Sequence, residues 1–137
     1  MSSTTNDVKI RILVVDDEPD ILLGLSALLE RQGHYVKTFD KAASALQHLT
    51  SEGAQFDLVI TDYRMPGGMS GLDLAKRVKK DTRRKTKVFL ISAFDISSSQ
   101  EFGEALESEI VDEVLQKPIR NDKLIAIIEK SFLHNNH

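Results

Sequence analysis

The chain has 137 residues, 41% of them hydrophobic, and this length suits one domain with one core. It contains no cysteine, which excludes disulfides and thiolate metal sites, and its formal net charge is −3. The first residues lack the apolar run of a signal peptide and no segment approaches the ~18 apolar residues of a membrane span, so we expect a cytoplasmic protein.

Short apolar segments alternate with segments of helical periodicity along the chain. In chain order, we expect strand Ile10–Val15, a helix from Pro19 that ends before Gly33, strand Tyr35–Phe39, helix Lys41–Ser51 with Gly53 beyond it, strand Asp57–Thr61, helix Leu72–Asp81, strand Val88–Ile91, helix Ser98–Glu107, strand Val111–Leu115 and helix Asn121–Leu133. The helix at 98–107 has few apolar residues and contains Gly103, so we expect it to be the least firmly held.

This alternation is typical of βαβ units. It predicts an α/β fold with a mostly parallel five-stranded sheet and helices on both faces. The domain should span residues 9–133, with polar tails at 1–8 and 134–137. In such open sheets, ligands bind outside the carboxyl ends of the strands.

Charge is segregated within the second half of the chain. Lysine and arginine crowd residues 76–87, whereas 97–113 contains acidic residues and no lysine or arginine. We interpret the basic segment as a helix C-terminus and the following loop, where cations complement the helix dipole. No aromatic or glycine residue lies between its charges, so we expect no direct nucleic-acid binding. We interpret the acidic segment as a solvated helix face, with a surface for a basic partner as the alternative.

Five chemically distinctive side chains lie at predicted strand ends: Asp16 and Asp17 after the first strand, Asp62 after the third, Ser92 after the fourth and Lys117 after the fifth. Two carboxylates roughly 4 Å apart repel by about 4 kcal/mol at an effective dielectric of about 20, so this crowding requires compensation. A hard-oxygen site with few protein ligands suits Mg²⁺ better than Ca²⁺. The sequence therefore predicts a Mg²⁺ site at this edge of the sheet.

Each of these residues, taken alone, has an ordinary explanation. Asp17 fits the N-cap of the next helix, and Asp62 fits a turn before the following proline. Ser92 fits a local hydrogen-bonding residue, and Lys117 fits a solvated surface charge. Their conjunction at one edge is what favours a functional site.

These residues and their contexts, "VVDDEPD", "DLVITDYRMPGG", "LISA" and "KP", resemble the receiver domains of two-component response regulators over 9–133. The resemblance implies a flavodoxin-like open sandwich with strand order 2-1-3-4-5. It also implies a phosphorylation-operated signalling module that accepts a phosphoryl group from a sensor histidine kinase or a phosphotransfer protein. Such a module does not turn over a separate substrate, although it catalyses its own phosphorylation and dephosphorylation.

The resemblance implies a role for each residue of the constellation. Asp62 would be the nucleophile that forms an aspartyl phosphate. Asp16, Asp17, one oxygen of Asp62 and the backbone carbonyl of Arg64 would hold Mg²⁺, whose charge offsets that of the transferred oxygens.

The remaining implied roles concern the fourth and fifth strands. Lys117 would pair with one phosphoryl oxygen, and Ser92 would donate a hydrogen bond to another. Receivers usually hold the Lys117–Pro118 peptide bond cis. Only about 5–6% of X-Pro bonds in folded proteins are cis, so this is a definite prediction.

Three positions depart from, or vary within, the family pattern. Val114 replaces the aromatic residue that usually reorients on the fifth strand, which leaves open how a signal reaches the face formed by the fourth helix, fifth strand and fifth helix.

Arg64 and Phe94 occupy positions that tune the lifetime of the phosphoryl group. Both side chains are large enough to obstruct an attacking water, and we hypothesise slow autodephosphorylation. Unchanged decay of the phosphorylated protein in Arg64→Ala and Phe94→Ala variants would contradict this hypothesis.

Several alternatives concern the output and the class of protein. The output is expected to be binding of a protein partner or phosphorylation-linked dimerisation, either in a single-domain regulator or in a receiver module of a larger response regulator or hybrid kinase.

A Mg²⁺-dependent phosphohydrolase of the haloacid dehalogenase type would need a second aspartate where Glu18 stands. A flavin-binding module is disfavoured by the acidic loop after the first strand. The presence of all five marker residues argues, more weakly, against a receiver that has lost phosphorylation.

Overall fold

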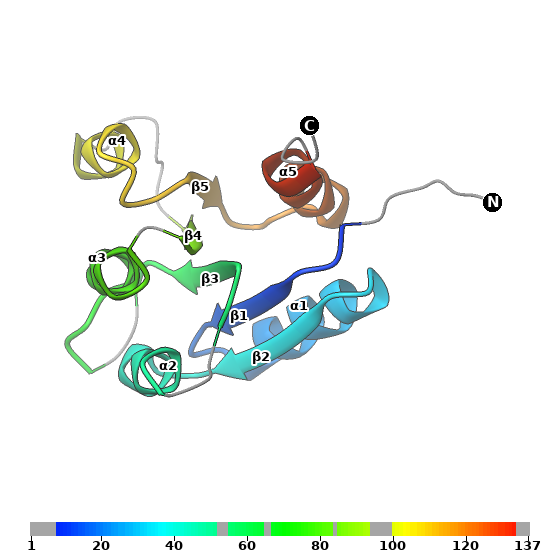
Figure 1. The fold of residues 1–137 in the computed structure, drawn as a ribbon. Coiled ribbons are helices and arrows are strands. Elements are labelled where there is room, and N and C mark those ends of the chain that lie inside the picture. The colour runs from blue at the N-terminus through cyan, green and yellow to red at the C-terminus, as the bar shows by residue number, and fades with distance from the viewer. Residues whose placement is uncertain (1–7, 52–54, 65–66, 84, 94–99, 134–137) are drawn as a thin grey trace.

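The computed structural model describes residues 8–51, 55–64, 67–83, 85–93 and 100–133. Strands and helices alternate strictly, as Figure 1 shows: β1 Arg11–Val15, α1 Pro19–Arg31, β2 Tyr35–Phe39, α2 Ala42–Leu49, β3 Leu58–Asp62, α3 Gly71–Asp81, β4 Lys87–Ser92, α4 Gln100–Glu107, β5 Glu113–Gln116 and α5 Asn121–Leu133. The predicted Gly53, Phe94 and Ser98 lie outside the described residues, as do residues 1–7 and 134–137 of the two predicted tails; Val8, placed in the first tail, is described and is buried. Within those residues, no helix has the length and apolar character needed to cross a membrane.

The five strands form one parallel sheet in the order β2-β1-β3-β4-β5. Helices α1 and α5 cover one face, and α2, α3 and α4 cover the other (Figure 1). The predicted α/β class, the strand order and the two helical layers are therefore confirmed. Because all strands are parallel, their carboxyl ends meet at one edge.

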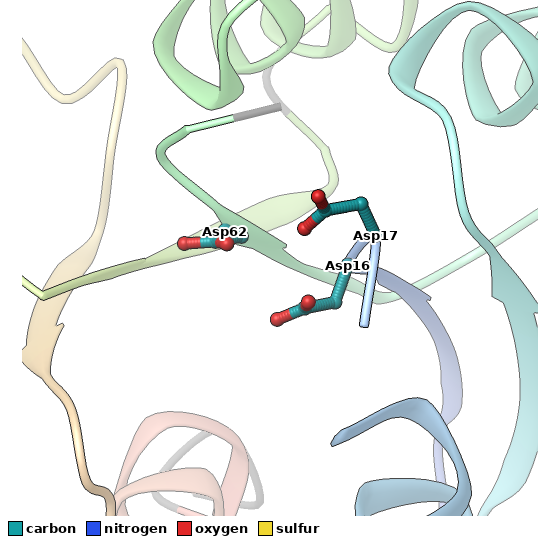
Figure 2. A group of neighbouring side chains, drawn as sticks. All are labelled: Asp16, Asp17 and Asp62. Atoms are coloured by element: carbon teal, nitrogen blue, oxygen red, sulfur yellow. The ribbon is translucent and has the colours of Figure 1, made fainter. Parts of the chain in front are cut away.

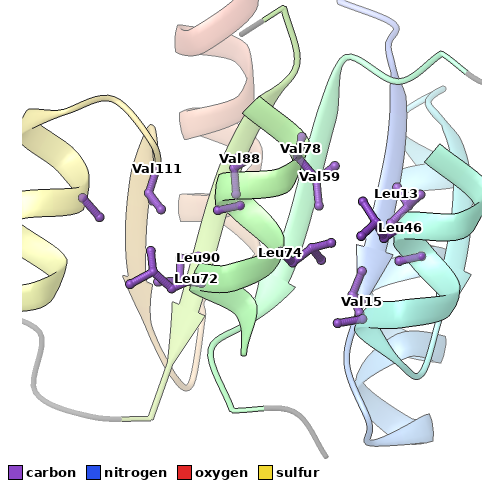
Figure 3. Packing of buried hydrophobic residues seen from close by; sticks show 14 of the residues in the cluster. Leu13, Val15, Leu46, Val59, Leu72, Leu74, Val78, Val88, Leu90 and Val111 are labelled. Atoms are coloured by element: carbon purple, nitrogen blue, oxygen red, sulfur yellow. The ribbon is translucent and has the colours of Figure 1, made fainter. Parts of the chain in front are cut away.

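The core consists of two apolar layers that share the strands. Leu13 and Val15 of β1 pack in the layer beneath α2, α3 and α4, which Figure 3 shows, whereas Ile12 and Val14 pack in the layer beneath α1 and α5. Side chains alternate between the two faces of a strand, so a sheet covered on both sides needs apolar residues at every position. This requirement explains the uninterrupted apolar run of β1.

The ends of α1 follow local rules that are visible in the sequence. Pro19 occupies the first turn, where its missing N–H has no partner to lose. At the other end, Gly33 has a φ of 97°, its N–H donates to Glu30 O and the N–H of His34 donates to Leu29 O. These two bonds form a Schellman motif, in which glycine adopts the left-handed conformation without steric cost.

Two predicted boundaries are wrong by two residues: α2 ends at Leu49 and not at Ser51, and β5 begins at Glu113 and not at Val111. The N–H groups of Ile110 and Val111 both donate to Ala105 O and so complete the C-terminus of α4. Val111 is fully buried, but in the layer beneath α4 and not as a paired strand residue. Its apolar character therefore reports burial and not strand pairing.

We expect His34 to make the stability of the domain pH-dependent. Its Nδ1 accepts a hydrogen bond from Ile10 N at 3.1 Å, and burial, followed by the charge of Lys9, lowers the pKa of this imidazole from 6.5. Because the folded state disfavours the protonated ring, the contribution of His34 to the free energy of unfolding should be fully present above pH 6.5 and should fall as the unfolded chain takes up a proton below it. Urea unfolding between about pH 5 and 8 measures this slope.

The matched variant is His34→Asn, whose side-chain oxygen can accept the same bond but does not titrate near neutrality. We expect a smaller fall in stability in this pH range for the variant than for the natural protein. Equal slopes would show that His34 does not carry the effect.

Candidate functional site

The five side chains predicted to form a site come from four strand ends that the parallel sheet brings together. Asp16 directly follows β1, and its N–H donates to Phe39 O at 3.1 Å. Asp62 and Ser92 are the last residues of β3 and β4, and β3 pairs with β4. Lys117 directly follows β5, and its N–H donates to Ser92 O at 2.8 Å. All five predicted positions therefore share one edge.

The carboxylates of Asp16, Asp17 and Asp62 form a cluster in which one oxygen from each lies within 4.8 Å of the others (Figure 2). Asp16 and Asp62 are buried, with 1% and 7% of their surface exposed, whereas Asp17 is exposed. The cluster therefore has one open side. Next to it lies a cavity of about 340 Å³ that is lined by Asp17, Glu18, Asp62, Tyr63, Arg64, Ser92, Ala93 and Lys117.

Lys117 places an ammonium among the carboxylates of the site. Its Nζ lies 3.2 Å from Asp62 Oδ2, 3.4 Å from Asp16 Oδ2 and 3.4 Å from Glu18 Oε2. One ammonium therefore faces several carboxylates and offsets only part of their charge.

The pKa values follow from this arrangement. Burial raises the pKa of Asp16, and the charge of Asp62 raises it further against the opposing effects of the Glu18 N–H and Lys117. Burial also raises the pKa of Asp62, although the charge and hydrogen bond of Lys117 oppose it. Burial alone would lower the pKa of Lys117, but the charges of Asp16 and Asp62 outweigh burial and raise it. At both Asp16 and Asp62, burial and the neighbouring carboxylate thus outweigh the favourable effect of Lys117.

The donor set fits a hard divalent cation. Asp16 Oδ1 accepts a hydrogen bond from Glu18 N at 2.9 Å, but its buried Oδ2 has no hydrogen-bond partner in the described part of the chain. Lys117 lies near that oxygen without the geometry of a hydrogen bond. A buried carboxylate oxygen without a donor is costly, and a cation that carboxylates bind would satisfy it.

We predict that Asp16→Asn stabilises the protein in the absence of divalent cations. The amide oxygen can keep the bond from Glu18 N while one buried negative charge is removed, so the free energy of unfolding at neutral pH should rise by about 1 kcal/mol. Added Mg²⁺ should raise the melting temperature of the natural protein and have little effect on the variant. Urea and thermal unfolding measure both effects.

Asp20→Asn is the control, because it removes a carboxylate at the exposed first turn of α1 and should lose a few tenths of a kcal/mol through the helix dipole. A stability of Asp16→Asn at or below that of the natural protein would contradict the prediction.

Of the other predicted positions, the cis peptide bond is confirmed, whereas the roles proposed for Arg64 and Phe94 stay predictions. The Lys117–Pro118 peptide bond is cis, as predicted. Arg64 lines the cavity, whereas Phe94 lies outside the described residues, so its role stays a prediction. Val114 lies in β5 and packs in the layer beneath α2, α3 and α4.

The structure adds three residues to which the sequence reasoning gave no role. Glu18 contacts Lys117, and Tyr63 lines the cavity. Gly71 begins α3 and its N–H donates to Tyr63 O at 2.8 Å, which places the helix directly against the end of β3. The position of Glu18 beside the two aspartates was a usable signal, but nothing in the sequence marks the close approach at Gly71.

Comparisons with known proteins identify the family of the chain. The family model of the response regulator receiver domain matches residues 12–129, and the chain belongs to this family. It is 33% identical over 120 residues to the transcriptional regulatory protein FixJ of Bradyrhizobium diazoefficiens and 32% identical over 123 residues to the response regulator receiver protein CpdR of Brucella abortus. The matches cover 88% and 90% of this chain, but 55% of the first relative and 97% of the second.

Solved structures agree with this assignment. The chemotaxis protein CheY4 of Vibrio cholerae superposes with a TM-score of 0.77 at 25% identity, covering 90% of this chain and 98% of that one. The response regulator TrrA of Thermotoga maritima, solved in complex with Mg²⁺ and beryllium fluoride, gives 0.72 at 33% identity, covering 88% and 96%. Residues 12–129 thus form a receiver domain of two-component signalling, and no observation on the described residues favours the phosphohydrolase or flavin alternatives.

Proposed function

We propose that Asp62 accepts a phosphoryl group from the phosphohistidine of a sensor kinase or phosphotransfer protein. The observation that carries the proposal is the cluster of three carboxylates with Lys117 3.2 Å from Asp62, beside an open cavity in a receiver fold. One oxygen of the Asp62 carboxylate forms the new bond to phosphorus as the bond from phosphorus to the donor nitrogen breaks. The electron pair of that bond stays on the imidazole nitrogen.

The neighbouring side chains have supporting roles in this proposal. Lys117 pairs with one phosphoryl oxygen, and Ser92, which lines the same cavity, donates a hydrogen bond to another. Asp16, Asp17, Asp62 and the backbone carbonyl of Arg64 would hold Mg²⁺, which when bound would supply positive charge to stabilise the transferred oxygens. The orphaned Asp16 Oδ2 supports Asp16 as one of these ligands.

The remaining parts of the proposal concern the whole protein. The domain spans residues 9–133 and acts in the cytoplasm, where it catalyses its own phosphorylation and dephosphorylation but turns over no separate substrate. Phosphorylation changes the face formed by α4, β5 and α5, and this change controls a protein partner or dimerisation. We propose no direct contact with nucleic acid for this domain.

The test is the intact mass of the full chain after incubation with acetyl phosphate and Mg²⁺. We expect a gain of one phosphoryl group that is absent in Asp62→Asn and after addition of EDTA. Asp57→Asn is the matched control and should keep the gain, because Asp57 lies at the opposite end of β3, where it accepts a hydrogen bond from Arg11 N.

A phosphoryl group that persists in Asp62→Asn would refute Asp62 as the acceptor. Absence of a mass gain would be followed by titration with beryllium fluoride, a stable mimic of the phosphoryl group. If the natural protein neither gains mass nor binds beryllium fluoride, the proposed function is wrong.

A further inference from the structure

Tyr63 connects the proposed phosphorylation site to α4. It directly follows Asp62 and lines the same cavity as Ser92 and Lys117. Its backbone is fixed on two sides, because its N–H donates to Ile91 O at 2.7 Å and its carbonyl accepts from Gly71 N at 2.8 Å. A change in the cavity can therefore be passed on through the side chain of Tyr63 more easily than through its backbone.

That side chain reaches the first turn of α4. The hydroxyl of Tyr63 donates to Glu101 Oε1 at 2.8 Å. The tyrosine ring packs edge-on against Phe102, with ring centroids 4.9 Å apart and an interplanar angle of 84°. Phe102 is 3% exposed and packs in the layer beneath α4, so the contact joins a surface hydrogen bond to a buried ring. Such an edge-on arrangement is favoured for aromatic pairs.

The described part of α4 has few other anchors. Its buried residues are Phe102 and Ala105, while Leu106 is 41% exposed and the helix surface carries several acidic side chains. Val114 of the neighbouring β5 lies in the same apolar layer and contributes only a short side chain. A helix with so little buried apolar surface is easily displaced, so one tether in its first turn has a large influence on its position.

We propose that Tyr63 is a positioning residue that couples the occupancy of the Asp62 site to α4. The inference rests on the proposed phosphorylation of Asp62 and names the route by which it is transmitted. In the structure, the Tyr63–Glu101 bond is present together with the pairing of Lys117 and Asp62, and Tyr63 lines the cavity beside that pair. A phosphoryl group in that cavity displaces the ring, breaks the bond and releases the first turn of α4.

The test uses beryllium fluoride with Mg²⁺ as the probe and amide NMR of the full chain as the readout. Because the bond opposes occupancy of the cavity, Tyr63→Phe should bind the probe about threefold more tightly, the size expected from one partly exposed hydrogen bond. In the natural protein, the probe should shift the amide of Ala105 in α4. In Tyr63→Phe without the probe, the Ala105 amide resonance should already be close to its probe-bound chemical shift. Addition of the probe should therefore change that chemical shift less than in the natural protein.

The chain offers matched controls. Glu101→Ala should raise the affinity for the probe as Tyr63→Phe does. The double variant of Glu101→Ala and Tyr63→Phe should bind the probe little more tightly than either single variant, because both changes remove the same bond. Tyr35→Phe removes the only other tyrosine hydroxyl, and Glu107→Ala removes an exposed acid from the same helix, so both should bind as the natural protein does.

Each outcome separates the two proposals. If the natural protein does not bind the probe, the proposed function fails. If it binds the probe and Tyr63→Phe has the same affinity and the same Ala105 shift, the coupling through Tyr63 is wrong while the proposed function stands. A lower melting temperature of Tyr63→Phe without a change in affinity would assign the tyrosine a purely structural role and would likewise overturn the coupling.

Discussion

Replacing Gly71 by alanine should lower the free energy of unfolding by about 3 kcal/mol, near the upper end of the range for overpacking. A Cβ at this position would overlap the carbonyl oxygen of Asp62 and lie 2.9 Å from both the carbonyl carbon of Asp62 and Cδ1 of Leu90. The obstructing atoms are mostly backbone, which cannot rotate away as a flexible side chain can. The first turn of α3 must therefore move off the end of β3 and lose the bond from Gly71 N to Tyr63 O.

The effect should extend to function, because the backbone that is pushed belongs to Asp62. Urea unfolding followed by circular dichroism measures the stability, and beryllium fluoride titration of the folded variant measures the site. Gly24→Ala is the control: Gly24 lies within α1, and no atom of another element lies within 4 Å of the place an alanine Cβ would take, so alanine should stabilise that helix by up to about 1 kcal/mol. A Gly71→Ala variant within about 0.5 kcal/mol of the natural protein, a difference typical of surface changes, would refute the close contact.

Removing the Asp112 carboxylate should also cost about 3 kcal/mol, the lower end of the range for breaking a buried ion pair. Asp112 Oδ2 accepts from Lys79 Nζ at 2.6 Å and from Val88 N at 2.8 Å, and the Lys79 side chain is only 6% exposed. In Asp112→Ala, a buried ammonium and a buried backbone N–H lose the same acceptor. Because Asp112 itself is 23% exposed in its side chain, water moderates part of the loss.

The partner variant Lys79→Met should be much less destabilising, at about 1 kcal/mol or less, because methionine fills the buried site without a charge and the remaining carboxylate keeps its bond from Val88 N. Arg77→Met removes the exposed pair with Asp81, at 3.7 Å, and should change stability by a few tenths of a kcal/mol. Chemical unfolding of the three variants checks this order. Equal costs for Asp112→Ala and Lys79→Met would show that the desolvated ammonium is not the cause.

Much of the site was predictable because parallel strands impose a simple geometry. Residues that follow different strands of one parallel sheet must meet at the same edge, so Asp16, Asp62, Ser92 and Lys117 could be grouped from their order in the chain alone. Their contacts could not be obtained in this way. That Lys117 also faces Glu18, and that one oxygen of Asp16 has no donor within the described residues, depends on side-chain positions that no periodicity encodes.

The errors at element ends have a related cause. The sequence pattern at Val111 correctly indicated burial. However, the N–H of Val111 donates to the carbonyl of Ala105 and is therefore not available for pairing with a neighbouring strand. The tight contact at Gly71 could not be predicted from the sequence either. Glycine is common in loops, and the need for glycine at this position arises from the nearby backbone of Asp62 in β3.

The sequence alone determined the class of fold, the strand order through its family resemblance, and the residues that gather at the carboxyl edge, because these follow from local periodicity and chain order. The tertiary structure alone decided which charges are compensated, how closely α3 approaches β3 and how Tyr63 reaches α4. These features depend on distances between segments far apart in the chain, and packing of the whole domain sets those distances.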